Sequence, residues 1–256
     1  MGNFASLINN QIMSKSKYTV DPDAYGKGLI AWLDGDRKAR FNVWSDIAET
    51  EKWDISIFFR EFEDMPLVEK EALKHCKGRI LDVGAGAGSH ALYLQEQGMD
   101  VVALDLSQGA TEVMLRRGVK QVTTRNFFDF HSDEKFDTIL MLMNGIGIVE
   151  KVKNLPNFFQ KAKDLLSSGG SILVDSSNII YMFEDEDGSA LIDLNADYYG
   201  EVIYRMDFGK MKGTKFNWLF IDFDTLSDYA SRAGFSCNKI YEDEHYLYLA
   251  ELKMQE

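Results

Sequence analysis

The sequence predicts an α/β fold, in which helices cover a mostly parallel β-sheet. Two observations lead to this prediction. From residue 79 onward, short apolar runs alternate with amphipathic stretches, which is the pattern of strands separated by helices. The first apolar run, residues 79–83 (RILDV), leads directly into three alternating glycines, GAGAG. Strands and helices that alternate form parallel sheets because each helix carries the chain back to the start of the next strand.

Five strands follow from this alternation. Their apolar runs are RILDV (79–83), DVVALD (100–105), VKQVTT (119–124), FDTILMLM (136–143) and SILVD (171–175). The run at 136–143 is apolar throughout, as expected of a strand that is covered by helices on both faces. Helices are predicted between the strands, and Ser107 is placed to cap the helix that follows Asp105.

Two regions depart from the alternation and divide the chain. The apolar residues before residue 78 have helix-like spacing, so residues 1–77 are predicted to form a helical N-terminal cap region. Residues 78–256 form the main domain, with an inserted lid at about residues 176–222. Within this insertion, EVIYRMDF and TKFNWLFID alternate like the two strands of a β-hairpin. A last helix and a closing antiparallel pair of strands complete the domain.

The composition limits the classes of partner. Of the 256 residues, 45% are hydrophobic, which is enough for a large core. Lys and Arg total 28 against 41 Asp and Glu, a formal net charge of -13. A surface of this charge repels polyanions, so neither nucleic acid nor an anionic membrane is an expected partner.

Cysteine usage and the N-terminus predict a cytoplasmic protein. Cys76 and Cys237 belong to no CxxC or Cys/His cluster, so we expect no metal site and a reducing compartment. The N-terminus lacks a basic region followed by an apolar stretch, so no secretory signal is expected. No run approaches the roughly 20 apolar residues of a membrane span.

The GAGAG stretch and Asp105 together predict a nucleoside site. Glycines between a strand and a helix let a ligand approach the helix N-terminus without meeting a β-carbon. Asp105 ends the next strand, 21 residues after Gly84, where a carboxylate can accept both ribose hydroxyls. A dinucleotide site would need Gly-x-Gly-x-x-Gly, but here Gly88 is followed by Ser89. The Gly-Lys-Ser or Gly-Lys-Thr of a phosphate loop is absent, so an adenosine-type cofactor is favoured.

These motifs resemble those of the class I S-adenosylmethionine-dependent methyltransferases of small molecules. The resemblance rests on ILDVGAGAG, the acid-ended ALD, FDTILMLMNGIG and the closing hairpin, and covers roughly residues 55–254. It implies a Rossmann-like, seven-stranded, mostly parallel sheet with an antiparallel last strand, to which the residue pattern adds the helical N-terminal cap and the inserted β-hairpin. It also implies S-adenosyl-L-methionine as the cofactor, lying across the carboxyl ends of the first strands.

The resemblance assigns side chains to the methionine and ribose parts of the cofactor. Asp82 and the backbone of residues 84–86 would hold the methionine part, and Arg60 would pair with its carboxylate. Asp105 would accept the ribose hydroxyls. Tyr25, in the N-terminal cap, would close the pocket from above.

The remaining assignments concern the adenine and the sulfonium. Leu106 would pack on the adenine, residues 126–128 would border it, and residues 143 and 144 would lie at the sulfonium end. An aromatic side chain at 127 or 128 gives the adenine an apolar wall. The predicted cofactor-binding residues are therefore Arg60, Asp82, Gly84, Ala85, Gly86, Asp105, Leu106, Asn126, Phe127, Phe128, Met143 and Asn144.

The methyl acceptor is expected to be a small molecule. Asn144 is followed by Gly-Ile-Gly, where enzymes that methylate exocyclic amino groups of bases have Pro-Pro-aromatic. A general base is needed only if the acceptor carries a proton, and no catalytic residue is assigned. The candidate bases at this edge of the sheet are His131, Asp175, Tyr181 and Asp222. An aromatic lid of Tyr198, Tyr204 and Trp218, and an acidic run at 184–187 that would attract an amine, are further candidates.

The residues leave three alternatives open. An aminopropyltransferase-like enzyme of the same fold would use a decarboxylated form of the cofactor, and the acidic run would suit its polyamine. A non-catalytic S-adenosylmethionine-binding protein would need no base. An NAD-dependent reductase is disfavoured by the glycine spacing. The acceptor atom and the oligomeric state do not follow from the sequence.

Overall fold

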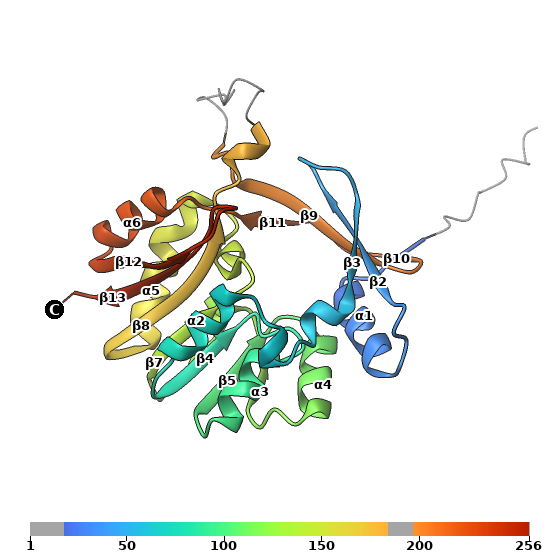
Figure 1. Cartoon of the computed structure of the whole chain (residues 1–256), viewed down its shortest axis with the longest axis horizontal. Helices are drawn as coiled ribbons and strands as arrows, with labels where there is room; N and C mark the ends of the chain where they lie inside the picture. Colours follow the sequence, from blue (N-terminus) through green and yellow to red (C-terminus); the bar gives the residue numbers. More distant parts are fainter. Residues whose placement is uncertain (1–17, 184–196, 256) are drawn as a thin grey trace, which may run out of the picture.

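The computed structural model describes residues 18–183 and 197–255, and a seven-stranded sheet forms the centre of the main domain (Figure 1). Its strand order is β12-β13-β8-β7-β4-β5-β6. The strands span Arg79–Val83 (β4), Asp100–Asp105 (β5), Val122–Thr124 (β6), Phe136–Met141 (β7), Leu166–Ser177 (β8), Phe235–Glu242 (β12) and Leu247–Met254 (β13). Strands β4 to β8 pair in parallel and β13 is antiparallel to both of its neighbours. The predicted mostly parallel sheet with an antiparallel last strand is therefore confirmed.

Helices cover both faces of this sheet. They are α2 (Leu67–His75), α3 (Ser89–Glu96), α4 (Gln108–Arg117), α5 (Leu155–Leu165) and α6 (Phe223–Arg232). Buried side chains of α5 and α6 pack with Leu81 and Val83 of β4, whereas those of α2 and α3 pack with Ile80. Successive residues of a strand point to opposite faces, so the apolar run RILDV supplies both cores. The predicted cap of α4 is confirmed, because Ser107 Oγ accepts a hydrogen bond from the backbone N–H of Ala110.

A second sheet arches over one end of the first and joins parts of the chain that are far apart in sequence (Figure 1). Its order is β1-β10-β9-β2-β3, and β11 also pairs with β9. Its strands span Thr19–Val20 (β1), Arg40–Ser45 (β2), Glu51–Asp54 (β3), Glu201–Phe208 (β9), Met211–Lys212 (β10) and Phe216–Leu219 (β11). The antiparallel pairing of β9 with β11 confirms the predicted hairpin.

The N-terminal region is only partly helical, which corrects the prediction of helices throughout it. Helix α1 (Ala24–Leu33), short 3-10 helices and α2 are present, but β2 and β3 lie between them. In β2, alternate residues are buried, the period of a strand with one covered face. Its partner β9 pairs Tyr204 with Ser45 and Phe208 with Phe41, so the stabilising contacts come from the other half of the chain. The spacing of apolar residues within the N-terminal region could not predict a pairing with a strand so far away in sequence.

Helix α1 packs closely against α4 through two glycines. A β-carbon on Gly109 would lie 2.6 Å from the Cα of Gly26, so only glycine lets the two backbones approach this far. Leu29 of α1 and Phe41 of β2 are fully buried in a third core, which includes Ala110 and Val113 of α4. The described part of the N-terminal region is thus fixed to the sheet domain by its own core. No helix within the described ranges is long and apolar enough to cross a membrane.

Candidate functional site

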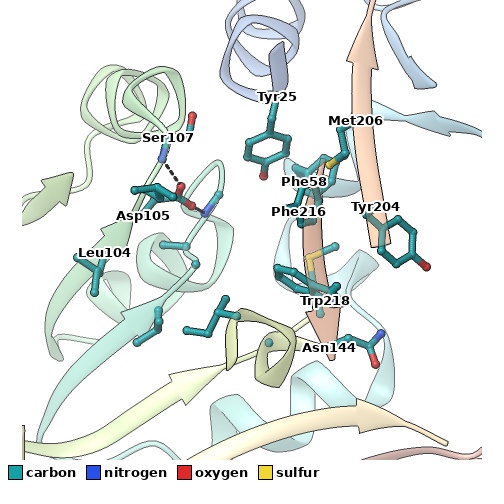
Figure 2. A pocket seen from close by; sticks show the side chains of 18 of the residues that line it. Tyr25, Phe58, Leu104, Asp105, Ser107, Asn144, Tyr204, Met206, Phe216 and Trp218 are labelled. Atoms are coloured by element: carbon teal, nitrogen blue, oxygen red, sulfur yellow. Dashed lines mark hydrogen bonds between the residues drawn. The ribbon is translucent and has the colours of Figure 1, made fainter. Parts of the chain in front are cut away.

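A cavity of about 800 Å³ lies between the carboxyl ends of β4 to β7 and the second sheet. Figure 2 shows Asp105 and Ser107 on one side of it and Tyr204 and Met206 on the other, with Tyr25 projecting from α1 between them. All twelve residues predicted to bind the cofactor line this cavity, and Tyr25 does as well. The structure therefore brings together side chains that lie as much as 84 residues apart, from Arg60 to Asn144.

The three alternating glycines all adopt left-handed backbone conformations. Their φ angles are 71° at Gly84, 56° at Gly86 and 82° at Gly88, which favour glycine over any residue with a side chain. A β-carbon on Gly88 would also lie 2.9 Å from Met114 of α4. The backbone N–H groups of Gly84 and Ala85 donate to the carbonyl of Leu104, which fixes the loop to β5. The loop is therefore a preformed surface of backbone at the N-terminus of α3.

Asp105 connects this loop to the start of α4. Its Oδ2 accepts a hydrogen bond of 2.8 Å from the N–H of Gly86, and its Oδ1 accepts one of 2.8 Å from the N–H of Ser107. Burial raises the pKa of this carboxyl to about 6, although the two N–H donors lower it. At neutral pH the carboxylate is therefore charged, fixed in orientation and available to further donors from the cavity.

Asp82 provides a second buried carboxylate, at the end of β4. It is 2% exposed, and its Oδ2 has no hydrogen-bond partner among the residues that the structure describes. Burial raises its pKa to about 6, while the neighbouring His90 lowers it. A buried carboxylate oxygen without a donor is costly, so this atom is suited to a cationic or donor group of a ligand.

A chain of ionisable groups lies beside Asp82. Nε2 of His90 is 2.8 Å from Oε2 of Glu69, and the other oxygen of Glu69 accepts a 2.5 Å hydrogen bond from Arg60. Burial lowers the pKa of His90, but the hydrogen bond to Glu69 and the charges of Asp82, Glu69 and Asp175 outweigh it, so the net pKa is raised. Arg60 is thus held by one carboxylate and keeps its other N–H donors for the cavity.

The end of β7 makes an unusual turn at the edge of the cavity. Met143 and Asn144 have φ angles of 63° and 57°, a left-handed conformation that costs free energy for residues with side chains. Asp175, at the end of β8, accepts hydrogen bonds from the N–H groups of Met143 (3.1 Å) and Gly145 (3.2 Å). Burial raises the pKa of Asp175 to about 7. Asp175 therefore stabilises the strained turn through these hydrogen bonds, although it does not itself line the cavity.

Of the residues predicted to lie near the methyl acceptor, some line the cavity and others do not. Tyr204 and Trp218 line the cavity, but His131, Asp175, Tyr181, Tyr198 and Asp222 do not. Asp222 instead caps α6 and accepts a hydrogen bond from the Tyr198 hydroxyl, and Tyr181 is exposed. The acidic run at 184–187 lies outside the described residues.

Several residues that line the cavity were not predicted. Among them are Asp23, Trp53 and Glu69. Each lies in a segment without a local motif, and it reaches the cavity only through long-range packing. Glu150 also lines the cavity, three residues after the Asn-Gly-Ile-Gly sequence, and was not predicted either.

Among all the residues that the structure describes, those of the cavity included, no group of three or more His, Cys, Asp or Glu side chains is arranged to hold a metal ion.

The sheet order and this cavity define a Rossmann-like nucleoside-binding protein whose ligand lies at the carboxyl ends of parallel strands. Comparison with known proteins identifies the family. The model of the methyltransferase domain family matches residues 63–238. An S-adenosylmethionine-dependent methyltransferase from Bacteroides fragilis, crystallised with S-adenosyl-L-homocysteine, is 44% identical, with a TM-score of 0.86 over 94% of this chain and 99% of that one. The chain belongs to the S-adenosylmethionine-dependent methyltransferases.

More distant matches agree with the fold. A methyltransferase from Clostridium acetobutylicum, 14% identical, covers 76% of this chain and 94% of that one with a TM-score of 0.54. The ubiquinone biosynthesis O-methyltransferase of Azorhizobium caulinodans is 29% identical over 119 residues, 43% of this chain. An uncharacterized methyltransferase of Staphylococcus carnosus is 31% identical over 84 residues, 31% of this chain. These two matches span only 45% and 41% of the curated relatives' own lengths.

Proposed function

We propose that this chain transfers the methyl group of S-adenosylmethionine to a small molecule held in the cavity between the two sheets. The observation that carries the proposal is the pair of cavity carboxylates, Asp105 fixed beside the glycine loop and Asp82 with an unpartnered oxygen. A ligand with ribose hydroxyls at one end and an ammonium at the other satisfies both. S-adenosylmethionine, when bound, supplies a methyl group activated by a positively charged sulfur.

The proposed roles of the lining residues follow from their chemistry. Asp105 accepts the ribose hydroxyls, and Asp82 accepts the ammonium of the methionine part. Arg60, already oriented by Glu69, pairs with the cofactor carboxylate. Leu106, Asn126, Phe127 and Phe128 surround the adenine, while Met143 and Asn144 lie at the sulfonium end.

The proposed charge balance of the site favours a cationic cofactor. Its lining contains five acids, namely Asp23, Glu69, Asp82, Asp105 and Glu150, against two arginines, Arg60 and Arg125, and one histidine, His90, whose pKa is raised. S-adenosylmethionine carries one net positive charge, from its sulfonium and ammonium less its carboxylate. A pyrophosphate-containing dinucleotide would meet net repulsion in the same cavity.

We further propose that the described parts of the N-terminal cap region (1–77) and of the inserted lid (about 176–222) act as one cover over a small acceptor. Strands β2 and β9 pair with each other, and side chains from both line the cavity, including Val43, Tyr204 and Met206. A single cover of this kind excludes water and aligns the acceptor with the methyl group, which is the main requirement of an in-line displacement.

The net charge of -13 makes nucleic acid an unfavourable substrate. The same excess of acids makes an anionic membrane an unfavourable partner, and the free thiols of Cys76 and Cys237 fit a protein of the cytoplasm.

Calorimetry with S-adenosylmethionine and S-adenosylhomocysteine tests the proposal. Asp105→Ala should weaken binding of both by about 1–3 kcal/mol, because hydroxyl-to-carboxylate hydrogen bonds are lost. Asp100→Ala is the matched control. Asp100 lies at the amino end of the same strand, away from the cavity, and its side chain is exposed. If neither compound binds at sub-millimolar concentration, the proposal fails. An unchanged affinity in Asp105→Ala would remove the assignment of that residue.

A further inference from the structure

The half of the cavity beneath the second sheet has an aromatic lining. We call it the acceptor chamber and define it by Trp53, Phe58, Tyr204, Phe216, Trp218 and Phe220. Figure 2 shows Phe216 and Trp218 along β11, with Tyr204 on the neighbouring strand β9. Four of the rings form a connected set: Tyr204 lies 6.3 Å from Phe216 and 6.1 Å from Phe220, measured between ring centroids, and Phe216 meets Trp218 edge-on at 6.0 Å. None of these rings is needed for the proposed cofactor contacts.

The backbone beside Trp218 is shaped to hold that ring. A β-carbon on Gly147 would lie 2.0 Å from the indole, so the indole packs directly on the backbone of η4 (Gly145–Val149). The Gly-Ile-Gly sequence after Asn144 therefore makes room for an aromatic shelf. Glu150 follows η4, and its N–H donates to the carbonyl of Gly147 at 2.9 Å. The backbone of Glu150 is therefore bonded to the glycine on which Trp218 packs, and Glu150 lines the same cavity.

The second sheet and η4 give the acceptor chamber an acidic side. Of the cavity-lining residues that the described parts of the second sheet and of η4 with its caps contribute, Glu150 is the one charged side chain. Arg60, two residues beyond Phe58, also lines the cavity and is paired with Glu69. Glu150 has φ 69° and ψ -47°, an unfavourable conformation for a residue with a side chain. Such strain is found where the surrounding structure fixes a group for function.

We infer that the acceptor chamber binds an organic amine, held as its ammonium cation against the aromatic rings with Glu150 as the counter-charge. This inference rests on the proposed methyl transfer and names its substrate class. Aromatic faces attract cations, most strongly when water is excluded, and indole gives the strongest attraction. A carboxylate at the rim of an aromatic box adds the opposite charge without filling the box.

Other acceptor classes fit the chamber less well. An anionic acceptor would meet the carboxylate of Glu150 and no Lys, Arg or His from the described part of the second sheet, which is unfavourable. An alcohol would need a base to remove its proton, and burial raises the pKa of Tyr204 to about 12, so this hydroxyl stays protonated at neutral pH. An ammonium must also lose a proton, but it is much more acidic than an alcohol and can give that proton to water.

The transfer balances with groups that are present. The ammonium first loses one proton to a water molecule. Water reaches this end of the chamber because Glu150 is exposed. The nitrogen lone pair then forms the new C–N bond, while the C–S bond of S-adenosylmethionine breaks and its electron pair stays on sulfur. The methylated amine takes over the positive charge that the sulfur loses.

A matched pair of probes tests the inference. Trimethyl(phenyl)ammonium and tert-butylbenzene have nearly the same shape and differ by one positive charge. Binding of each to the full chain saturated with S-adenosylhomocysteine is measured by tryptophan fluorescence, since Trp53 and Trp218 line the chamber. The cation should bind on the order of tenfold more tightly than the neutral probe. Equal affinity, tighter binding of the neutral probe, or no binding of either overturns the inference.

Two variants locate the effect in the chamber. Glu150→Gln and Trp218→Leu should each reduce the preference for the cation several-fold. Both variants should still bind S-adenosylhomocysteine, which shows that they are folded. Glu96→Gln, an exposed acid on α3, is the matched control and should leave the preference unchanged. A preference that survives in both chamber variants contradicts the inference. If S-adenosylhomocysteine itself fails to bind, the proposed function is wrong, and the same probe pair on the free protein still decides the charge preference.

Discussion

Asp23 and Ser107, 84 residues apart, are joined by a 2.5 Å hydrogen bond from the serine hydroxyl to the carboxylate. The backbone N–H of the same serine donates to Asp105, so one residue lies between two carboxylates (Figure 2). Asp23 also accepts hydrogen bonds from the N–H groups of Gly26 and Gly109, at the first turns of α1 and α4. The side chain that caps α1 is thus bonded to Ser107, which in turn donates to Asp105.

This relationship predicts that Asp23→Ala weakens cofactor binding without removing a cofactor contact. The variant loses the cap of α1 and the acceptor for Ser107 and Gly109, which should destabilise the fold by about 1–2 kcal/mol. Affinity for S-adenosylhomocysteine, measured by calorimetry, should fall on the order of fivefold because α1 and Tyr25 are less firmly held. Asp36→Ala, which removes an exposed carboxylate from the turn after α1, should change neither quantity measurably. Unchanged affinity in Asp23→Ala would show that the cap and the ribose site are independent.

The sequence alone could predict Asp105 but not Asp23, and the reason is physical. Asp105 ends an apolar strand next to a glycine-rich loop, and both features are local in sequence. Asp23 has its role only because α1 packs on α4, an arrangement set by Gly26 and Gly109. The β2–β9 pairing is hidden for the same reason, since Ser45 and Tyr204 are brought together by tertiary contacts. Local patterns reveal elements and motifs, whereas residues that connect distant segments appear only in the folded chain.

Cofactor affinity should rise with pH between about 5 and 7.5. Burial raises the pKa of both Asp82 and Asp105 to about 6, so each carboxyl becomes protonated as the pH falls through that value. A protonated Asp82 cannot pair with an ammonium, and a protonated Asp105 loses an acceptor for the ribose. Calorimetry should show that the affinity for S-adenosylhomocysteine falls on the order of tenfold from neutral pH to about pH 5. Asp82→Asn should flatten part of this dependence; a wild-type affinity that is constant or rises in acid contradicts the assignment.

Asp175→Ala should destabilise the fold more than most surface changes. Without the carboxylate, the N–H groups of Met143 and Gly145 lose their acceptor in a left-handed turn. Leaving two such donors unsatisfied should cost about 2–4 kcal/mol, measured by urea unfolding. Asp228→Ala, an exposed position on α6, is the control and should cost less than about 0.5 kcal/mol.

The conservative variant Asp175→Asn separates the charge from the hydrogen bonds. Burial raises the folded-state pKa of Asp175 to about 7, above its value in an unfolded chain. The folded state therefore holds this proton more tightly, and the wild type loses stability as the pH rises from about 4 to 7. Asn cannot ionise, so its stability relative to the wild type should increase over that range. If the difference in unfolding free energy between the two proteins stays constant with pH, folding does not raise the pKa of Asp175.

Gly147→Ala should disturb the aromatic shelf while sparing the cofactor half of the cavity. The new methyl group would lie 2.0 Å from the Trp218 indole, so the ring must move, at a cost of about 1–3 kcal/mol. Because Gly147 does not line the cavity, S-adenosylhomocysteine should still bind, whereas binding of trimethyl(phenyl)ammonium should weaken. The clash depends on the indole, so Trp218→Leu should remove most of the added cost in a double-mutant cycle, with a coupling free energy of about 0.5–3 kcal/mol. Strictly additive unfolding free energies would mean that backbone movement accommodates the new methyl group and that the shelf is not fixed by this contact.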